Sequence, residues 1–314
     1  MTFPLADTEE RFEAVVDDES ALRPGVDRLL GRLDLRGEPV RYPDGSLPVY
    51  RVGEHVLKLF PAVHLEELPT ERDVLRAVHG RLPVPTPAVR EAGEVDGWGY
   101  VLMERLRGTG LVEVWPTLDA AGRESVARQV GEALAVLHDL PSPVDHPADW
   151  SSFVAARRVA PRRPVDPAWA DRVDEFLDRV DLGADEPVLA HTEVMSAHLL
   201  VEGTRLTGLI DFEPAMRAAR EYEFVATGIF LTRGDQAANR ALYTGYGRPV
   251  DPLRVMAYTL LHVYSNLAWY LREVPPPADV DTLDALARHW FGSAPVRPSS
   301  RTMDADAEAR EARP

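Results

Sequence analysis

The sequence has no cysteine and only one lysine, and each of these shortages narrows the chemistry that is open to the chain. Without cysteine there are no disulfides, no thiolate nucleophile and no cysteine-ligated zinc. Long apolar runs are missing too, so no segment is expected to cross a bilayer. The acidic start of the chain lacks the apolar core of a signal peptide. We therefore expect a cytoplasmic protein with no membrane partner.

Positive charge is also scarce relative to negative charge. The 314 residues include 35 basic and 51 acidic side chains, which gives a formal net charge of −16. Nonspecific nucleic-acid binding depends on basic patches that displace phosphate counterions, so we expect no nucleic-acid partner. An acidic cleft would concentrate a cationic ligand, although an acidic surface also simply keeps a protein in solution. The charge alone leaves both interpretations open.

The single lysine is Lys58, and the other 34 basic residues (35 − 1) are arginines. A chain that uses arginine almost everywhere and keeps lysine at one place suggests a task that a guanidinium performs poorly. A compact, strongly hydrated ammonium that reaches a phosphate performs such a task. Chance retention of one lysine is the alternative, and composition does not separate the two.

The first third of the chain has the pattern of a small unit rich in β-hairpins. After a loose, acidic lead-in over residues 1–18, residues 20–33 carry apolar side chains at helical spacing. Residues 40–60 read as strands separated by two turn signals, and residues 69–78 predict a further helix. A strand pair is expected around residues 97–106.

The pattern changes to long helices beyond Gly108. Residues 124–140 are strongly amphipathic, a proline- and arginine-rich stretch over residues 142–167 interrupts, and residues 166–180 predict another helix. The C-terminal third reads as helices with many aromatic residues and ends near Trp290.

These elements predict an α+β, bilobal architecture, with a small β-rich N-terminal lobe and a larger, mostly helical C-terminal lobe. We expect the N-terminal lobe to span residues 1–105 and the C-terminal lobe to span residues 106–292. A cleft is expected where the two lobes join, at roughly residues 103–108. Residues 293–314 are expected to form a disordered tail because their composition is polar and charged.

The segment 189–213 gathers the side chains with the clearest chemistry. Two short strands within it predict a hairpin that turns at residues 202–204. A hairpin brings its outer ends together, so His198 and Asp211 should be neighbours, with Glu193 at the same edge. This arrangement suits phosphoryl transfer, in which one group orients or deprotonates the attacking hydroxyl and others hold Mg²⁺ on the phosphates.

This segment resembles the catalytic motif of the aminoglycoside phosphotransferases, which is H-G-D-x-x-x-x-N followed by I-D-F or I-D-W. The match includes His191, the spacing of the motif and the triplet at residues 210–212. Three positions depart from it: Thr192 stands for glycine, Glu193 for the catalytic aspartate and His198 for the metal-binding asparagine.

The remaining landmarks of that family follow in the same order. Lys58 resembles the strand lysine that contacts the α- and β-phosphates, and Glu71 resembles the helix glutamate that pairs with it. Ser46 lies where the hairpin that covers the nucleotide belongs. The backbone around Glu104 and Leu106 resembles the linker that hydrogen-bonds a purine. The resemblance spans most of the chain, and its details favour the hygromycin phosphotransferase-like branch.

The three departures bear on activity. Glu193 is about 1.5 Å longer than aspartate, and misplacements of that size change rates on the order of 10²-fold. His198 is a softer ligand than an asparagine oxygen, and Mg²⁺ prefers oxygen. His198 either joins Asp211 at the metal or contacts a phosphate and leaves Asp211 as the main ligand. A second carboxylate, Glu213, lies two residues further on.

The resemblance implies a protein-kinase-like fold in which the N-terminal lobe binds the nucleotide and the C-terminal lobe carries the catalytic and substrate residues. It also implies an enzyme that moves the γ-phosphoryl group of ATP or GTP, with Mg²⁺, to a hydroxyl of an antibiotic of aminoglycoside or nucleoside type. The benefit would be resistance or self-protection. The implied catalytic residues are Glu193, Asp211 and His191, the last of which packs beneath the loop in the family. The implied nucleotide-binding residues are Lys58, Glu71, Ser46, Glu104 and Leu106, and the implied metal ligands are Asp211 and His198.

Two alternatives stay open, namely a metabolic small-molecule kinase and a noncatalytic nucleotide-binding protein. The sequence does not indicate the acceptor, the preferred nucleotide or the oligomeric state. One group of candidates for acceptor contacts is the aromatic residues of the segment 257–271, for most of which core packing is the stronger expectation. The other group is acidic residues of the C-terminal lobe, for which a merely exposed, solvated position is an equal alternative. The two groups are Tyr258, His262 and Trp269, and Glu221, Glu223 and Asp235.

Overall fold

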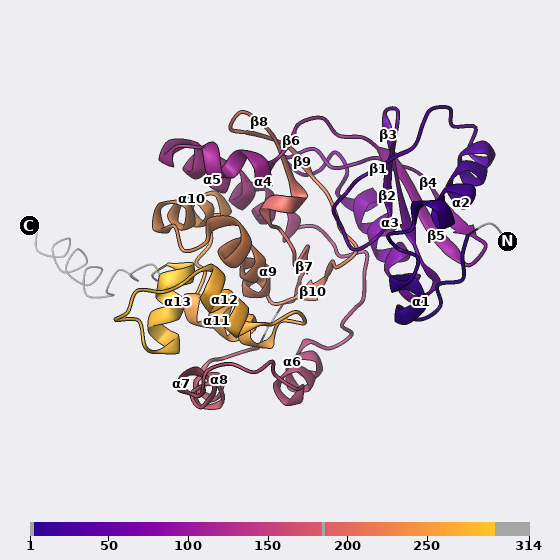
Figure 1. Cartoon of the computed structure of the whole chain (residues 1–314). Helices are drawn as coiled ribbons and strands as arrows, with labels where there is room; N and C mark the ends of the chain where they lie inside the picture. The colour runs from indigo at the N-terminus through magenta and orange to yellow at the C-terminus, as the bar shows by residue number, and fades with distance from the viewer. Residues whose placement is uncertain (1–2, 184–185, 293–314) are drawn as a thin grey trace, which may run out of the picture.

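The structure of the chain, a computed structural model, describes residues 3–183 and 186–292. It has two lobes, a small N-terminal one built on a β-sheet and a larger one that is mostly helical (Figure 1). This confirms the α+β, bilobal fold class expected from the sequence. The boundary at residue 105 stays a prediction, and the predicted disordered tail, residues 293–314, lies outside the described residues.

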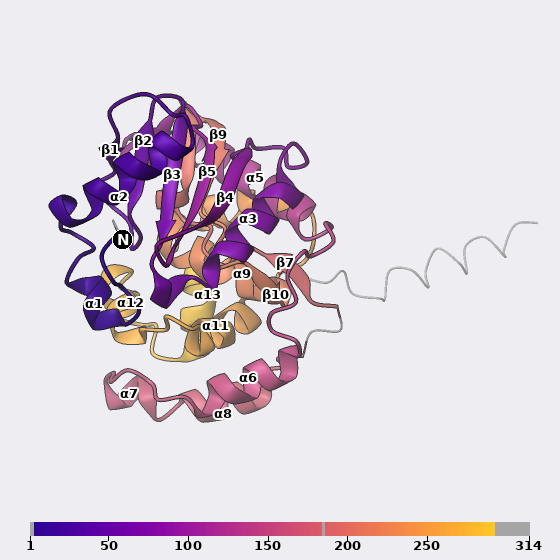
Figure 2. The same ribbon diagram turned by 90° about the vertical axis from the view of Figure 1, so that its right-hand side faces the viewer.

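The N-terminal lobe contains a five-stranded antiparallel sheet in the order β1-β2-β3-β5-β4, which Figure 2 shows strand by strand. Its strands are β1 (Val40–Arg41), β2 (Val49–Val52), β3 (His55–Phe60), β4 (Val89–Val95) and β5 (Trp98–Glu104). Its helices are α1 (Glu9–Glu13), α2 (Glu19–Arg32), η1 (Ala62–His64) and α3 (Glu67–Val78). Because β3 is the central strand, with β2 and β5 on either side, all four residues from Leu57 to Phe60 are buried.

The first residues do not form the loose lead-in that the sequence suggested. Phe3 and Phe12 are buried, and the Phe3 ring stacks on Trp98 with ring centroids 5.4 Å apart. The Trp98 indole N–H donates to the Pro4 carbonyl at 2.8 Å. A few apolar side chains therefore anchor a segment whose overall composition is polar. The average composition of residues 1–18 does not reveal these individual anchors.

The C-terminal lobe begins after β5 and contains short strands between many helices. Its strands are β6 (Thr109–Gly110), β7 (Val188–Ala190), β8 (Leu199–Glu202), β9 (Arg205–Leu209) and β10 (Met216–Ala218). Its helices before β7 are α4 (Leu111–Val114), η2 (Trp115–Thr117), α5 (Ala120–Leu137), α6 (Trp150–Val159), α7 (Pro167–Ala170) and α8 (Val173–Arg179). Those after β7 are η3 (Ser196–His198), α9 (Arg220–Ala226), η4 (Thr227–Thr232), α10 (Gln236–Tyr246), α11 (Pro252–Leu261), α12 (Leu267–Glu273) and α13 (Leu283–Phe291).

Helices α9 and α11 form the centre of this lobe, since nearly all of their residues are buried. Helices α6, α7 and α8 lie together beyond α11, at the bottom of both ribbon views (Figures 1 and 2). Two sequence expectations are wrong here. The stretch 142–167 is not only an interruption, because it contains α6, and the single helix expected over residues 166–180 is divided into α7 and α8.

Both corrections have a tertiary origin. Buried Trp150 at the start of α6 packs against Tyr222 and Tyr258 with ring centroids 5.4 and 5.5 Å apart, which fixes a helix that its proline-rich neighbourhood disfavours. In α8, three residues face the core, whereas none of the four residues of α7 is buried. Within the described ranges, no helix combines the length and the apolar character that a membrane span requires.

Helices α5 and α10 pack with their backbones almost in contact. A Cβ atom added at Gly131 of α5 would lie 2.0 Å from the Leu242 carbonyl oxygen, and one added at Gly245 of α10 would lie 2.0 Å from the Arg128 carbonyl oxygen. Neither obstacle is a side chain that is free to rotate away. The two glycines therefore set the distance between these helices.

We expect Gly131→Ala to lower the free energy of unfolding by about 1–3 kcal/mol, because the added methyl group forces two packed helices apart. Urea denaturation followed by circular dichroism measures this change. The matched control is Gly31→Ala in α2, where a Cβ atom meets nothing within 4 Å. That change should be neutral or stabilising by up to about 1 kcal/mol. Equal effects at the two positions would contradict the close helix contact.

Candidate functional site

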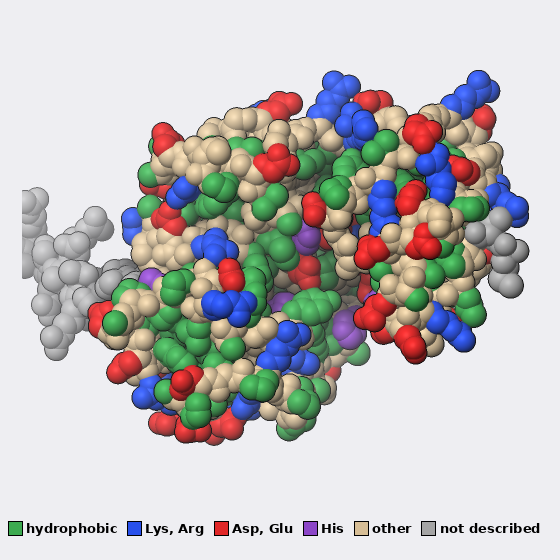
Figure 3. Space-filling model, in the orientation of Figure 1, with side chains coloured by type: hydrophobic (Ala, Val, Ile, Leu, Met, Phe, Trp, Pro, Cys, Tyr) green, Lys and Arg blue, Asp and Glu red, His purple; other side chains and the backbone are tan. Residues whose placement is uncertain are grey.

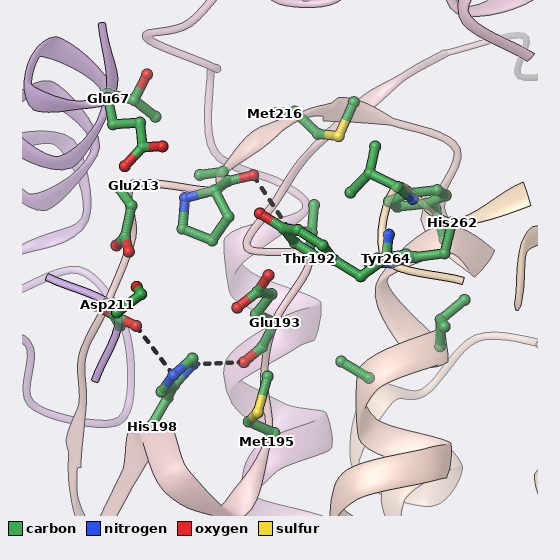
Figure 4. A pocket seen from close by; sticks show the side chains of 18 of the residues that line it. Glu67, Thr192, Glu193, Met195, His198, Asp211, Glu213, Met216, His262 and Tyr264 are labelled. Atoms are coloured by element: carbon green, nitrogen blue, oxygen red, sulfur yellow. Dashed lines mark hydrogen bonds and ion pairs between the residues drawn. The ribbon is translucent and has the colours of Figure 1, made fainter. Parts of the chain in front are cut away.

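The hairpin of β8 and β9 places His198 and Asp211 side by side, as its length predicted. β8 pairs with β9 from Leu199 opposite Leu209, and the Ile210 N–H donates to the His198 carbonyl at 3.1 Å. The His198 Nε2 atom lies 3.0 Å from Asp211 Oδ2 (Figure 4). Asp211 itself adopts a positive φ of 77°, which turns its carboxylate out of the strand direction.

Lys58 reaches this hairpin from the sheet of the other lobe. Its ammonium Nζ lies 2.5 Å from Asp211 Oδ1 and 2.6 Å from Glu213 Oε2. The third carboxylate near it, Glu71 of α3, is further away, at 3.8 Å from Nζ. The structure thus brings the predicted residues Lys58, Glu71 and Asp211 together from β3, α3 and the end of β9, and it adds Glu213.

Burial and pairing set the charges of this cluster. Burial opposes the charged form of Lys58, but the charges of Asp211, Glu71 and Glu213 outweigh it and hold its pKa well above the usual value. Burial also opposes the Asp211 carboxylate, yet Lys58 and the His198 hydrogen bond hold the Asp211 pKa well below its usual range. Burial raises the pKa of Glu71, and it raises the pKa of Glu213 well above its usual value. Within this cluster, the charged forms of Lys58 and Asp211 are therefore the ones that pairing favours most.

His198 is positioned by two different acceptors. Its Nδ1 lies 2.8 Å from the Glu193 carbonyl, which only accepts, so Nδ1 carries a proton. Its Nε2 faces the ionised Asp211 carboxylate, which favours a second proton there. Burial opposes that charge, but the hydrogen bond to Asp211 outweighs it and raises the pKa of His198. His198 thus links the loop that carries Glu193 to the Asp211 carboxylate.

His191 lies fully buried beneath the same loop. Its Nδ1 accepts the Glu193 N–H at 3.3 Å, so Nε2 carries the proton and donates to the Ile210 carbonyl at 3.0 Å. Burial lowers the pKa of His191, which keeps the ring neutral. Both ring nitrogens are occupied by backbone groups. His191 therefore holds the backbone on either side of the site in place.

Glu223 of α9 holds the loop from below. Its carboxylate accepts the His191 N–H at 2.6 Å and the Thr192 N–H at 3.1 Å, and the side chain is fully buried. Thr192 has a φ of 70°, a conformation that a β-branched residue rarely adopts and that a glycine tolerates. Its hydroxyl donates to the Pro214 carbonyl at 3.1 Å, which helps to hold the strained position.

Glu193 follows this anchored turn and faces a cavity of about 830 Å³ between the lobes. Figure 3 shows the hollow, with hydrophobic, histidine and acidic side chains exposed in it, and Figure 4 shows Glu193 between Asp211 and Tyr264. Burial raises the pKa of Glu193. The cavity is also lined by residues of the N-terminal lobe, of the β9–β10 connection and of the C-terminal helices, among them Ser46, Glu67, Glu213, Met216, Phe230 and Tyr264.

Two predicted nucleotide residues lie elsewhere. β5 ends at Glu104, which is exposed, and Leu106 follows half-buried in the connection between the lobes. Neither belongs to the lining of the 830 Å³ cavity, whereas Ser46 does. The Arg105 N–H donates to the Glu54 carbonyl at 2.9 Å, so this connection is fixed against the β2–β3 turn.

Most of the candidate acceptor contacts serve the core instead. Tyr258 is fully buried and its hydroxyl donates to the Leu182 carbonyl. Glu223 holds the loop, and Asp235 caps α10 through the Ala237 and Ala238 N–H groups. Trp269 packs on Phe230, while His262 does line the cavity. The expectation that the carboxylates of Glu223 and Asp235 contact the acceptor is therefore wrong.

Sequence reasoning missed several cavity residues. Glu67 lies one helical turn before Glu71 on α3, and this spacing was a usable signal. Tyr264 lies inside the aromatic segment that was singled out, but its place at the cavity depends on the α11–α12 connection. Phe153 comes from α6, in the stretch that was read as an interruption.

The arrangement places several carboxyl groups on a single cavity, among them Glu193 with a raised pKa, and pairs two of the others with one buried ammonium. An ammonium and hard oxygen ligands suit an anionic, metal-bound phosphate chain. A partly buried carboxylate with a raised pKa suits proton removal from a hydroxyl. The described residues contain no preformed group of three or more potential metal ligands, so a bound ion would draw further ligands from substrate or water.

The chain resembles phosphotransferases in both sequence and structure. Residues 40–258 match the model of the phosphotransferase enzyme family. An aminoglycoside 3'-phosphotransferase of Niallia circulans is 29% identical over 229 residues, which cover 68% of this chain and 84% of that protein.

Solved structures of phosphotransferases match the fold. The GDP complex of a mutant aminoglycoside 2'-phosphotransferase IIIa matches with a TM-score of 0.62 and 19% identity, over 91% of this chain and 96% of the other. A macrolide 2'-phosphotransferase from Brachybacterium faecium matches with a TM-score of 0.57 and 22% identity, over 87% and 99%. Matching structures include complexes with GDP, ADP or ATP. These likenesses confirm the kinase-like fold.

We expect Glu223→Gln to lower the free energy of unfolding by about 1–3 kcal/mol, because an amide nitrogen cannot accept one of the two buried N–H groups. Denaturant titration measures this loss, and faster amide exchange at Thr192 would locate it in the loop. Glu202→Gln is the control, since that side chain is 55% exposed and its ion pair with Arg205 contributes at most about 1 kcal/mol. No difference between the variants would contradict the anchoring role.

Stability should also fall in acid because of His262. Burial and the nearby Arg157 lower the pKa of His262 to about 4. The unfolded chain, in which a histidine has a pKa near 6.5, therefore binds the proton first as the pH falls. The free energy of unfolding of the native protein should drop by roughly 3 kcal/mol more than that of His262→Gln between pH 7 and pH 4. Parallel stability curves for the two proteins would contradict a neutral, buried His262.

Proposed function

Because this chain belongs to the phosphotransferase enzyme family, we propose that it transfers the γ-phosphoryl group of ATP or GTP to a hydroxyl of a small molecule such as an antibiotic. The observation that carries this proposal is that Glu193 and Asp211 line one cavity, with Lys58 bonded to Asp211 from the other lobe. These three side chains come from separate elements of both lobes. Such positioning, with electrostatic stabilisation, accounts for most of the catalysis of phosphoryl transfer.

Lys58 would hold the phosphate chain, and Glu71 would help to position it. The ammonium is held by Asp211 and Glu213, which line the cavity, and it has a longer contact of 3.8 Å to Glu71. Ser46, from the loop between β1 and β2, lines the same cavity and would cover the phosphates.

The connection between the lobes would hold the base. The Arg105 N–H is directed to the Glu54 carbonyl and the Glu104 N–H to the Ala88 carbonyl, so the Glu104 carbonyl and the Leu106 backbone would be the groups that face a purine. The N-terminal lobe, residues 1–105, would therefore carry the nucleotide, and residues 106–292 would carry the acceptor. GDP in one matching structure and ATP in another support either purine nucleotide.

The donor set fits Mg²⁺. Carboxylate oxygens of Asp211 and Glu213 already converge on one cationic atom, the Lys58 ammonium, and Mg²⁺ is usually held by one or two carboxylates together with substrate phosphates. Bound there, Mg²⁺ would supply charge neutralisation for the phosphates. We propose Asp211 as the main ligand with Glu213 beside it. His198 joins this set only after its Nε2 proton is lost, since the metal needs that lone pair.

Glu193 would orient the acceptor hydroxyl and take its proton. As the hydroxyl oxygen bonds to the γ-phosphorus, the bond to the bridging oxygen breaks and the nucleoside diphosphate leaves. The hydroxyl proton passes to a carboxylate oxygen of Glu193. The raised pKa of Glu193 makes it a stronger base than an exposed carboxylate. His191, His198 and Glu223 hold the loop on which this geometry depends.

The biological setting belongs to this proposal too. A relative that is an aminoglycoside 3'-phosphotransferase supports antibiotic modification, and with it resistance or self-protection, in the cytoplasm where ATP and GTP are present. From the motif details given above, we also propose that the chain belongs to the hygromycin phosphotransferase-like branch.

Phosphoryl transfer itself tests the proposal. Purified protein with Mg²⁺ and ATP or GTP is incubated with aminoglycoside, nucleoside and macrolide acceptors, and mass spectrometry detects a phosphate adduct. We expect Glu193→Gln to lower kcat by about 10²–10⁴-fold, the usual contribution of a general base. Asp211→Asn should abolish transfer, as should removal of Mg²⁺ by a chelator. Glu202→Gln, on the exposed turn of the hairpin, should leave the rate unchanged.

The opposite result is equally informative. Nucleotide binding with no adduct on any acceptor would favour the noncatalytic alternative. That alternative was raised because Glu193 and His198 replace the aspartate and the asparagine of the motif. An adduct that survives Glu193→Gln at full rate would refute the role given to Glu193.

A further inference from the structure

The side of the cavity opposite Asp211 and Glu213 is lined by aromatic rings. We call this the aromatic wall, and it consists of Phe153, Tyr222, Phe230, His262, Tyr264 and Tyr270. These residues come from α6, α9, η4, the α11–α12 connection and α12. Figure 4 shows His262 and Tyr264 across the cavity from Asp211 and Glu213, with Glu193 between the two sides.

The rings of the aromatic wall are held by one another before any ligand binds. Tyr222 stacks on His262 with ring centroids 4.8 Å apart and an interplanar angle of 22°. Phe153 meets Tyr222 edge-on at 6.0 Å, and Phe230 meets Tyr270 at the same distance. A preformed apolar surface binds a ligand with little ordering cost.

Tyr264 projects from a connection that is itself fixed. The Val263 N–H donates to the Tyr222 hydroxyl at 3.4 Å, and the Tyr270 hydroxyl donates to the Tyr264 carbonyl at 3.3 Å. Despite these anchors, Tyr264 is 62% exposed and Val263 is 46% exposed. A large apolar ring kept in water on a rigid backbone, at the edge of a cavity, is typical of a binding surface.

His262 adds one uncharged donor to the aromatic wall. Its Nδ1 accepts the Tyr264 N–H at 3.3 Å, so the proton is on Nε2. Nε2 is buried and has no hydrogen-bond partner among the described residues. Burial and the charge of Arg157 keep the pKa of His262 near 4, so the ring is neutral. An acceptor oxygen on a ligand would satisfy this N–H, whereas an ammonium group would not.

Negative charge lies on the other side of the cavity. Of the described lining residues, the carboxylates are Glu66 and Glu67 at the start of α3, together with Glu193, Asp211 and Glu213. Lys58 occupies Asp211 and Glu213, and Glu67 lies 3.2 Å from the His64 ring. Behind the aromatic wall is the Arg157 guanidinium, which donates to the His262 carbonyl at 2.9 Å. A polycation would thus meet apolar rings and a positive charge there.

We propose that the acceptor is an alcohol with a large, mostly apolar ring body, an oxygen that accepts a hydrogen bond, and at most one ammonium group. The aromatic wall binds the ring body, His262 Nε2–H donates to the oxygen, and Glu193 takes the proton of the hydroxyl. Tyr264 and Phe230 then determine specificity. This inference rests on the proposed function, since it identifies the acceptor of the same site, and it disfavours polyamine sugars in spite of the net charge of −16.

Calorimetric binding separates the two classes of acceptor. The protein is loaded with Mg²⁺ and a nonhydrolysable ATP analogue and titrated with erythromycin, a large lactone with one amine, with kanamycin, a polyamine sugar, and with choline. We expect the Kd for erythromycin to be at least tenfold lower than the Kd for either of the others. Tighter binding of kanamycin or choline, or no binding of erythromycin, overturns the inference.

Variants locate the binding to the aromatic wall. Tyr264→Ala changes an exposed side chain, so the variant should fold normally. The substitution should raise the Kd for erythromycin at least tenfold without changing the affinity for the nucleotide. Phe230→Leu keeps an apolar side chain and should also lower the affinity for erythromycin. The control is Val159→Ala on α6, an apolar residue that is 84% exposed away from the cavity. Unchanged erythromycin affinity in Tyr264→Ala would overturn the assignment.

Binding and transfer fail in different ways. Binding of erythromycin as expected, with no phosphate adduct on erythromycin or on any other acceptor, would refute the proposed function and leave the aromatic wall as a binding surface. A phosphate adduct formed on kanamycin in preference to erythromycin would support the proposed function and overturn the inference about the acceptor.

Discussion

The contact on which the rest of this structure depends is the ion pair between Lys58 and Asp211. The ammonium comes from the central strand of one lobe and the carboxylate from a hairpin of the other, and the two atoms lie 2.5 Å apart. Lys58 is only 4% exposed, so its charge is stable there only because carboxylates surround it. This pair therefore fixes the approach of the two lobes and with it the shape of the cavity between them.

The loop with Glu193 depends on a second layer of contacts. A threonine occupies a position with a φ of 70°, where glycine is favoured, and the buried carboxylate of Glu223 accepts the N–H groups of Thr192 and of His191. The neutral His191 ring joins the loop to the backbone just before Asp211. Strain of this kind persists only where the surroundings hold it in place. The unusual residues of the motif are thus supported by specific partners, and the loop retains a defined shape.

Overall charge and local charge point to different ligands. The net charge of −16 suggests a cationic partner, but most of the carboxylates that line the cavity lie across from the aromatic wall, and two of them are already paired with Lys58. The aromatic wall presents rings and one neutral donor. Since electrostatic attraction at long range is screened in salt, the groups within contact distance decide which ligand is bound.

The amino-acid sequence by itself determined the order of most elements, but not α1, α6 or the division between α7 and α8. Hydrophobic periodicity and turn residues predicted the β-rich first lobe, the helical second lobe and the hairpin that joins His198 to Asp211, because these signals are local. The motif residues likewise singled out Lys58, Glu71 and Asp211 before their contacts were known. Only the tertiary structure decided that Phe3 anchors the first segment, that Glu223 supports the loop rather than a ligand, and that Tyr264 and Phe153 share one surface. Those contacts join residues far apart in the chain, and no local pattern records which side chains the packing of helices brings together.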